Sequence, residues 1–496
     1  MQRASGILMS ITSLPSPYGI GTIGKEARDF ADFLETAGQK IWQLLPVCPT
    51  SYGDSPYQSF STYAGNPYLI DLDYLAEEGL LDKDTLEKIS WGDDPEKVDY
   101  ETIYNNRFNV LRTAYNNFKQ HDQKEFRRFK IRNAAWLKDY ALYMAVKQSF
   151  GMCSWTEWPD ESIRNREQNA VEKYTRKYRD EINFWKFLQF KFYQQWNSFR
   201  EYVNSKNVIL MGDMPIYVAL DSADVWANPE IFWLNEEKQP VCVAGCPPDY
   251  FSETGQLWGN PLYNWEYLKE TNYTWWFNRI KAASKLFDLT RIDHFRAFDA
   301  YYAIPFPAED AKNGSWYEGP GIEFFLEMKK AIGDIPIVAE DLGTHTESLE
   351  QLLEDSGYPG MKVLQFAFDS GEANNHLPHH YIENSIVYTG THDNDTLLGW
   401  QNKANAYDIN SAVDYCGITD DEGFCSGIIR TAYESKSNYV IIQMQDWLEL
   451  GTEARMNIPS TLGENWVWRI DKRALTTKLA NKIKTMCKIT GRMGDT

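Results

Sequence analysis

Carboxyl side chains follow four short apolar segments of this 496-residue chain. They occur in MGDMP (Asp213), TRIDHF (Asp293), VAEDLG (Glu340 and Asp341) and TGTHDND (Asp393 and Asp395). Two carboxyl groups with separate roles are the minimum for cleaving a glycosidic bond, because one protonates the leaving oxygen while the other attacks the anomeric carbon or activates water. A single acid after a strand is usually a helix cap or a turn residue. Four such positions together favour a catalytic cluster.

The neighbours of two of these acids suggest how each could work. Arg291 lies two residues before Asp293, so on a strand their side chains share a face. A guanidinium beside a carboxylate keeps it ionised, as a nucleophile requires, and a structural salt bridge is the alternative. Glu340 and Asp341 are adjacent, so only one can point to the centre of the fold, where apolar neighbours would raise its pKa and suit a proton donor. Both have equally apolar neighbours, so this pattern ranks Glu340 first only weakly.

Eight β-type segments must position these acids: 6–13, 41–46, 208–215, 287–294, 335–341, 361–369, 386–393 and 439–447. Helical patterns alternate with them in the second half, as at 323–332 and 346–355. Thr344 and Glu347 are spaced as a capping box for the latter helix, and Gly357 follows its end. Alternating β and α segments with apolar strands indicate a parallel sheet buried on both faces. We therefore predict a (β/α)8 TIM barrel, with catalytic groups at the C-terminal ends of the strands. An open doubly wound sheet is the alternative.

The spacing of these segments is uneven. A plain barrel needs about 250 residues, so we expect one catalytic unit over residues 1–496 with two large insertions. The first, 49–206, is mainly helical, with helices expected at 101–119, 134–150 and 169–205. The second, 216–286, is rich in aromatic residues, Gly and Pro. Its loop 245–265 contains five aromatic residues, which predict either a small hydrophobic mini-core or a lid over a substrate: Tyr250, Phe251, Trp258, Tyr263 and Trp265.

Composition excludes several classes of protein. A net charge of −20 disfavours nucleic acid and anionic membrane surfaces as partners. Seven scattered Cys without a CxxC motif indicate reduced thiols, and no apolar run approaches a membrane span, so we expect a cytoplasmic location. The chain has 18 Trp, 30 Tyr and 25 Phe. Many of these rings belong in a core, but flat rings also stack on sugars.

Long segments of the chain resemble the amylomaltases, also called disproportionating enzymes or 4-α-glucanotransferases, of glycoside hydrolase family 77. The matching segments are SPYQSFSTYAGNPYLI (55–70), GDMPIYVA (212–219), GCPPDYFSETGQLWGNPLYNW (245–265), RIDHFRAF (291–298), AEDLG (339–343), VLQFAFD (363–369), GTHDNDTLLGW (390–400) and EARMNIP (453–459). The resemblance implies a retaining enzyme on a barrel of the α-amylase type. It implies Asp293 as nucleophile, Glu340 as acid/base and Asp393 as transition-state stabiliser. It also implies a substrate-binding surface formed by Tyr57, Asp213, Gln256, Trp258, Arg291, His294, Asp369 and His392.

The resemblance implies transfer of α-1,4-glucan segments from a malto-oligosaccharide donor to a glucan or glucose acceptor through a β-glucosyl-Asp intermediate, with no metal and no cofactor. A hydrolase on the same scaffold is the near alternative, because the acids do not distinguish water from sugar as acceptor. A metalloenzyme is a second alternative, since Asp293 with His294, or His392 with Asp393, could ligate a divalent ion. A non-catalytic glucan-binding protein is the third, but it has no need of four acids at strand ends.

Overall fold

An eight-stranded parallel sheet forms the centre of the molecule in the computed structural model, which describes residues 3–51, 53–248 and 252–493. The strands are β1 (Ala4–Leu8), β2 (Ile41–Gln43), β3 (Ile209–Pro215), β6 (Leu289–Asp293), β9 (Ile337–Ala339), β10 (Gly360–Val363), β11 (Ser385–Tyr388) and β12 (Tyr439–Gln443). Each lies within or overlaps one of the eight segments expected from the sequence. Most are shorter than expected, because the polar residues that follow them form turns and 3-10 helices instead of continuing the sheet.

The sheet closes into a barrel. Its strand order is β10-β11-β12-β1-β2-β3-β6-β9, which follows the chain around a ring, whereas a doubly wound sheet reverses direction at a switch point. Between the two end strands, the Ala339 amide donates a hydrogen bond to the Pro359 carbonyl at 3.0 Å. The Met361 amide also donates to Asp341 Oδ1 at 2.6 Å. The predicted (β/α)8 barrel is confirmed, and the open sheet is wrong.

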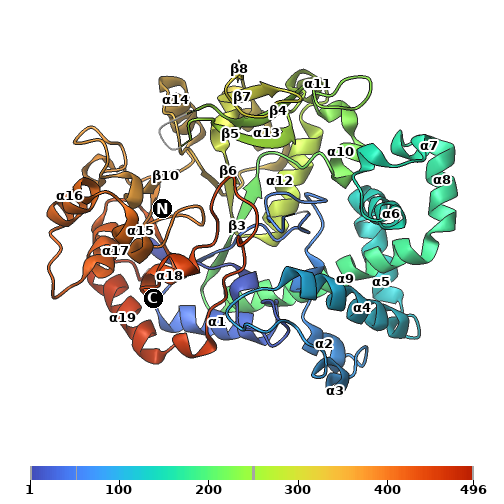
Figure 1. The fold of residues 1–496 in the computed structure, drawn as a ribbon, viewed down its shortest axis with the longest axis horizontal. Helices are drawn as coiled ribbons and strands as arrows, with labels where there is room; N and C mark the ends of the chain where they lie inside the picture. Colours follow the sequence, from blue (N-terminus) through green and yellow to red (C-terminus); the bar gives the residue numbers. More distant parts are fainter. Residues whose placement is uncertain (1–2, 52, 249–251, 494–496) are drawn as a thin grey trace.

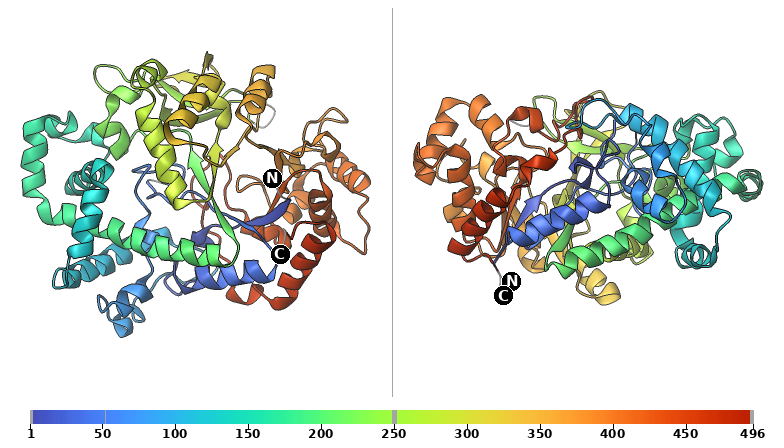
Figure 2. Two further views of the ribbon diagram at one scale, coloured as in Figure 1. Left: turned by 180° about the vertical axis from the view of Figure 1, so that it is seen from behind. Right: turned by 90° about the horizontal axis from the view of Figure 1, so that it is seen from below.

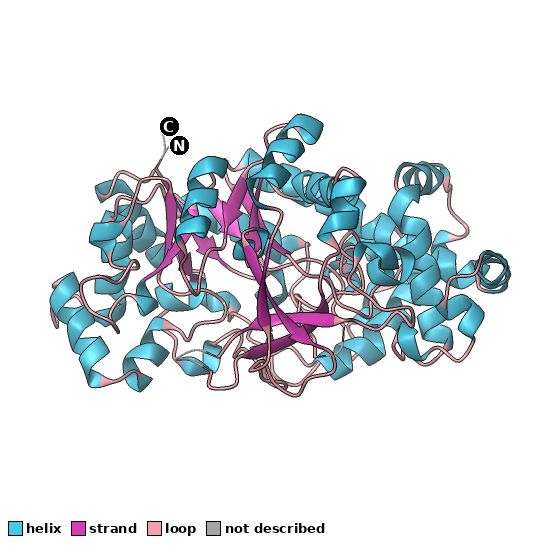
Figure 3. Ribbon diagram, turned by 90° about the horizontal axis from the view of Figure 1, so that it is seen from above, coloured by secondary structure: helices cyan, strands magenta, loops and turns pink. Residues whose placement is uncertain are grey.

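Helices surround the barrel strands (Figures 1 and 3). They include α1 (Lys25–Thr36), α12 (Thr274–Leu286), α13 (Gly321–Ile332), α14 (Glu347–Ser356), α15 (Leu397–Lys403), α16 (Ala406–Cys416), α17 (Phe424–Glu434), α18 (Met444–Trp447) and α19 (Thr477–Ile489). The cap of α14 differs from the expectation: Thr346, not Thr344, accepts a hydrogen bond from the Leu349 amide at 3.3 Å. Thr344 lies in the preceding loop, where its carbonyl accepts from Arg296 Nη1. Gly357 ends the helix in the left-handed conformation, with φ of 73°.

The first strand and the last helix lie side by side, as Figure 2 shows in blue and red. Ser5 Oγ in β1 is 3.3 Å from Cys487 Sγ in α19. The buried Arg492 guanidinium, just after α19, donates to the carbonyls of Ser437 and Ala4 at the start of β12 and β1. The C-terminal segment therefore fastens the amino-terminal end of the barrel.

Between β2 and β3 the chain forms a group of helices beside the barrel, coloured blue to green in Figure 1. They are α2 (Leu72–Glu77), α3 (Lys83–Leu86), α4 (Tyr100–Phe118), α5 (Lys124–Arg132), α6 (Ala134–Ser149), α7 (Glu161–Arg164), α8 (Gln168–Lys177) and α9 (Arg179–Ser205). The helix expected over 169–205 is two helices that meet at Tyr178, whose φ of −106° and ψ of 28° are not helical. In the part of the chain that is described, no helix is both long and apolar enough to cross a membrane.

A second, antiparallel sheet lies at one side of the barrel, at the top of Figure 1. Its order is β5-β4-β7-β8, formed by β4 (Cys242–Cys246), β5 (Gln256–Pro261), β7 (Ala300–Pro305) and β8 (Ser315–Glu318). The segment between β3 and β6 supplies β4 and β5, together with α10 (Ala223–Ala227) and α11 (Trp265–Glu270), while the segment after β6 supplies the other two strands. The sequence analysis did not predict this sheet, which joins two segments that are separate in the sequence.

Candidate active site

Three charged side chains form the centre of the site, at the C-terminal ends of β3 and β6. The register of these strands places Asp213 opposite Arg291. Arg291 Nη1 lies 2.7 and 2.6 Å from the two carboxylate oxygens of Asp213 and 2.9 Å from Asp293 Oδ1. The Asp213 and Arg291 side chains are 0% and 4% exposed, against 29% for Asp293. The expected contact between Arg291 and Asp293 is present, but the sequence did not indicate that Asp213 shares the guanidinium.

Glu340 follows β9, the neighbour of β6 in the barrel. Its Oε2 accepts a hydrogen bond from the amide of His294 at 2.6 Å, and its Oε1 accepts from the amide of Leu342 at 2.8 Å. Asp341 instead accepts a hydrogen bond from the main-chain amide of Met361 in β10. The structure therefore separates two acids that the sequence ranked only weakly: Glu340 is bound to the residue after Asp293, and Asp341 joins two strands.

Burial and charge give the two central acids different pKa values. Burial raises the pKa of Glu340 to about 8, against the opposing effect of Arg291, and the negative charge of Asp293 adds to the rise. Burial also raises the pKa of Asp293, to about 6, again opposed by Arg291. The sequence led us to expect that Arg291 keeps Asp293 ionised, but burial outweighs the guanidinium and the negative charge of Asp213 adds to the rise in pKa. The pKa of Glu340 therefore lies above that of Asp293.

Asp393 lies in the loop after β11 and is held from a distant part of the chain. Asn457 Nδ2 donates to Asp393 Oδ1 at 2.6 Å, and Arg455 donates to the Asp393 carbonyl. The Asn457 amide donates to the carbonyl of His392 at 3.1 Å. We call residues 454–458 the strap. Arg455 and Asn457 of the strap were not predicted as site residues, although they belong to the EARMNIP segment on which the resemblance partly rests.

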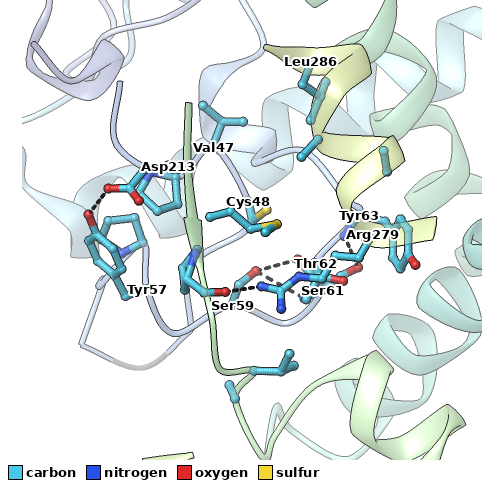
Figure 4. Close-up of a pocket in the computed structure, with 18 of the residues that line it drawn as sticks. Val47, Cys48, Tyr57, Ser59, Ser61, Thr62, Tyr63, Asp213, Arg279 and Leu286 are labelled. Carbon is cyan, nitrogen blue, oxygen red and sulfur yellow. Dashed lines mark hydrogen bonds between the residues drawn. The ribbon is translucent and has the colours of Figure 1, made fainter. Parts of the chain in front are cut away.

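Tyr57 and His392 form one wall of the site. The Tyr57 hydroxyl donates to Asp213 Oδ2 at 2.7 Å, and its ring stacks on the imidazole with centroids 5.0 Å apart and planes 14° apart. Nε2 of His392 lies 3.4 Å from Asp393 Oδ1, so this wall links Asp213 to Asp393. Figure 4 shows Tyr57 and Asp213 at one edge of a cavity that is also lined by Val47, Cys48, Ser61, Thr62, Arg279 and Leu286.

Trp258 and His294 form a second wall of the site. Their rings meet edge to face, with centroids 4.8 Å apart, and Trp258 Nε1 donates to Gln256 Oε1 at 3.1 Å. The Tyr217 ring lies 6.2 Å from each of the two rings and was not predicted in the site. Burial lowers the pKa of His294 to about 3, so this imidazole is neutral.

The other aromatic residues of loop 245–265 differ from Trp258 in their surroundings. Tyr263 is buried and donates to the Ile216 carbonyl, and Trp265 stacks on Trp276. Tyr263 therefore forms part of the core, as the mini-core interpretation has it, while Trp265 and Trp258 are both half-buried and pack against that core. Tyr250 and Phe251 lie outside the described residues.

Asp369, which was also predicted as a site residue, contacts a different part of the chain. It is exposed and accepts a hydrogen bond from Asn374 Nδ2 at 3.0 Å, and its charge acts on Asp408 at the start of α16. Its place in substrate binding stays a prediction.

The metal hypothesis meets a physical difficulty at this site. The Arg291 guanidinium already occupies the position beside Asp213 and Asp293 where a cation would bind. Within residues 3–51, 53–248 and 252–493, no three or more His, Cys, Asp or Glu side chains are arranged to hold a metal ion.

A (β/α)8 barrel with paired acids at its strand ends defines the class: an enzyme acting on glycosidic bonds. The family model for 4-alpha-glucanotransferase, glycoside hydrolase family 77, matches residues 9–476, and the chain belongs to this family. It is 50% identical over 486 residues to a 4-alpha-glucanotransferase of Clostridium butyricum, covering 98% of this chain and all of that protein. It is 44% identical to the enzyme of Thermus thermophilus, over 99% of this chain and all of that protein.

The fold agrees with this assignment. The structure of an amylomaltase from Streptococcus agalactiae in complex with acarbose superposes with a TM-score of 0.97 and 44% identity, over the full length of both chains. The amylomaltase of Corynebacterium glutamicum, at 17% identity and a TM-score of 0.77, shares the fold over 99% of this chain and 75% of its own length. The chain is thus an enzyme, a 4-α-glucanotransferase, and the predictions of family and enzyme class are confirmed.

Proposed function

We propose that this enzyme transfers α-1,4-glucan segments by a retaining mechanism in which Asp293 forms a covalent β-glucosyl intermediate. Asp293 attacks the anomeric carbon of a malto-oligosaccharide donor while Glu340 gives its proton to the departing glycosidic oxygen. Glu340, now a carboxylate, then removes the proton from the 4-hydroxyl group of an incoming glucan or glucose. That oxygen displaces Asp293, and two inversions restore the α configuration.

The observation that carries this proposal is the different surroundings of two acids at the ends of neighbouring strands. Arg291 lies 2.9 Å from Asp293 and favours the charged form that a nucleophile needs. Glu340 has a pKa of about 8 because it is buried, so it holds the proton that a leaving oxygen requires. Two titratable groups whose environments separate their pKa values are a hallmark of paired acid and nucleophile.

We assign the third role, stabilisation of the positive transition state, to Asp393. Its side chain is 45% exposed, so it can reach a bound sugar, and Asn457 fixes one of its oxygens. Tyr57 and His392 then face the same sugar ring from the adjoining wall. Arg291 and Asp213 support the nucleophile from below through buried contacts.

Water and sugar compete for the glycosyl intermediate, and hydrolysis is therefore the second candidate outcome. Trp258 favours transfer, because a half-buried indole against His294 can cover the reacting sugar and exclude water from it. We further propose that the barrel and the segments 49–206 and 216–286 act as one catalytic unit, since β4 pairs with β7, which follows β6.

Incubation with maltotriose tests the proposal. Transfer converts maltotriose into a ladder of longer chains together with glucose, and the number of reducing ends stays constant. Hydrolysis gives shorter products alone and raises the number of reducing ends. A rise in reducing ends without longer products would contradict the proposed transfer.

A further inference from the structure

Two neighbouring aromatic residues on the edge strand β8 are equally exposed but contact different parts of the molecule. Trp316 and Tyr317 are each 43% exposed. The Trp316 ring lies against the Arg296 guanidinium, 4.2 Å from its central carbon, and 5.3 Å from the Tyr302 ring. Tyr317 instead packs on Tyr301 and Trp233, at 5.9 and 5.5 Å. Only Trp316 is therefore connected to Arg296.

Arg296 connects Trp316 to the acid/base residue. Arg296 lies two residues after His294, whose main-chain amide donates to Glu340. Nη1 of Arg296 donates to the carbonyl of Thr344, which lies four residues after Glu340. Arg296 thus connects the indole to the two segments that follow Asp293 and Glu340.

The same region contains two buried polar side-chain atoms that are not hydrogen-bonded within the protein. Nε of Arg296 and Nε2 of His294 have no hydrogen-bond partner among the described residues. Both residues are at least nine-tenths buried, at 4% and 8% exposure. Unpaired buried polar atoms cost free energy unless a ligand or water satisfies them. Sugar hydroxyl groups can both donate and accept, so they suit either atom.

We propose that Trp316 is a binding platform for the acceptor glucan, beyond the first acceptor sugar. This inference rests on the proposed function, because it takes Glu340 as the proton donor. A proton donor to the leaving oxygen lies at the bond that breaks, so the side of Glu340 away from Asp293 holds the leaving chain and, later, the acceptor. One face of the indole is fixed by Arg296, and the exposed remainder offers a rigid apolar surface to a sugar ring.

The test uses acceptors of increasing length, from glucose to maltohexaose, at a fixed concentration of one donor. For Trp316→Ala, we expect the half-saturating concentration of maltohexaose to rise about tenfold, equivalent to about 1.4 kcal/mol, while that of glucose stays unchanged. Trp316→Leu keeps apolar volume beside Tyr302 but lacks the flat ring, and we expect the same loss for the long acceptor. Tyr317→Ala is the matched control, because it removes an equally exposed neighbour without contact to Arg296.

The outcomes separate the inference from the function on which it rests. A wild-type enzyme that forms no transfer product would overturn the proposed function itself. If the wild type transfers but Trp316→Leu and Trp316→Ala show the same change with glucose as with maltohexaose, the platform is wrong and Trp316 is structural. An equal length-dependent loss in Tyr317→Ala would also overturn the assignment to Trp316. Melting curves of all three variants confirm that folded protein is compared.

Discussion

The acids after β6 and β9 are held differently from the acid after β11. Asp293 and Glu340 are positioned by the barrel itself, through Arg291 on the same strand and through two main-chain amides. Asp393 is more exposed, and its carboxylate is fixed by the side chain of Asn457, from a strap 64 residues further along the chain. Adjacent strands of one sheet therefore position the proposed reacting pair, while the third acid depends on contacts between separate segments. Substitutions should affect these two regions in different ways.

The largest effect should come from the reacting pair. We expect Asp293→Asn and Glu340→Gln each to lower kcat/KM for transfer by at least about 1000-fold, because nucleophile and acid/base act as a unit. Transfer from maltotriose and a melting curve measure the two properties separately. Near-normal transfer by either folded variant would remove its residue from the mechanism.

The strap should have a smaller effect, and one that can be traced to a single contact. We expect Asn457→Ala to lower kcat by up to about 100-fold, since a displacement of about 1 Å in a reacting group can cost that much. Asn465→Ala is the matched control: Asn465 accepts from the amide of Ile458 in the same strap but its side chain does not bond to Asp393. Equal losses in both variants would show that the strap as a whole, and not its contact with Asp393, determines the rate.

This contrast also explains which parts of the fold and of the site could be predicted from the sequence. The strands and the pairing of Arg291 with Asp293 follow from local rules, apolar runs and i,i+2 spacing, and the structure agrees with them. The choice between Glu340 and Asp341 needed the position of β10, because both have apolar neighbours in the sequence. The contact of Asn457 with Asp393 and the pairing of β4 with β7 join distant segments, and no local pattern specifies such contacts.

The pH dependence tests the protonation states of the proposed reacting pair. Asp293 must be a carboxylate, so transfer should fall as the pH decreases below its pKa of about 6. Glu340 must carry a proton, so transfer should also fall as the pH increases above about 8. We expect a bell-shaped profile of kcat/KM with roughly a tenfold loss per pH unit beyond each limb. A profile that stays flat above pH 8 would argue against Glu340 as the proton donor.

The smallest expected change concerns Trp258, which lies outside both groups of acids. We expect Trp258→Ala to raise the ratio of hydrolysis to transfer several-fold while the total rate of donor cleavage falls less, because under our proposal the indole excludes water and helps to bind the acceptor. Counting reducing ends and ladder products in the same reaction gives the ratio. An unchanged ratio in a variant that melts much earlier would mean that Trp258 serves only to pack its loop.

The central claim is the covalent bond between the sugar and Asp293, and mass spectrometry of a trapped intermediate tests it most directly. Fluoride ion leaves an α-glycosyl fluoride without help from an acid, so the Glu340→Gln variant should still form the intermediate. The second step should be slow in this variant, because it needs the general base. We expect the peptide that contains Asp293 to gain the mass of one glycosyl group. A glycosyl group found on another acid would contradict the mechanism. Rapid turnover of the fluoride to a product of inverted configuration, with no glycosyl group on the protein, would contradict it as well.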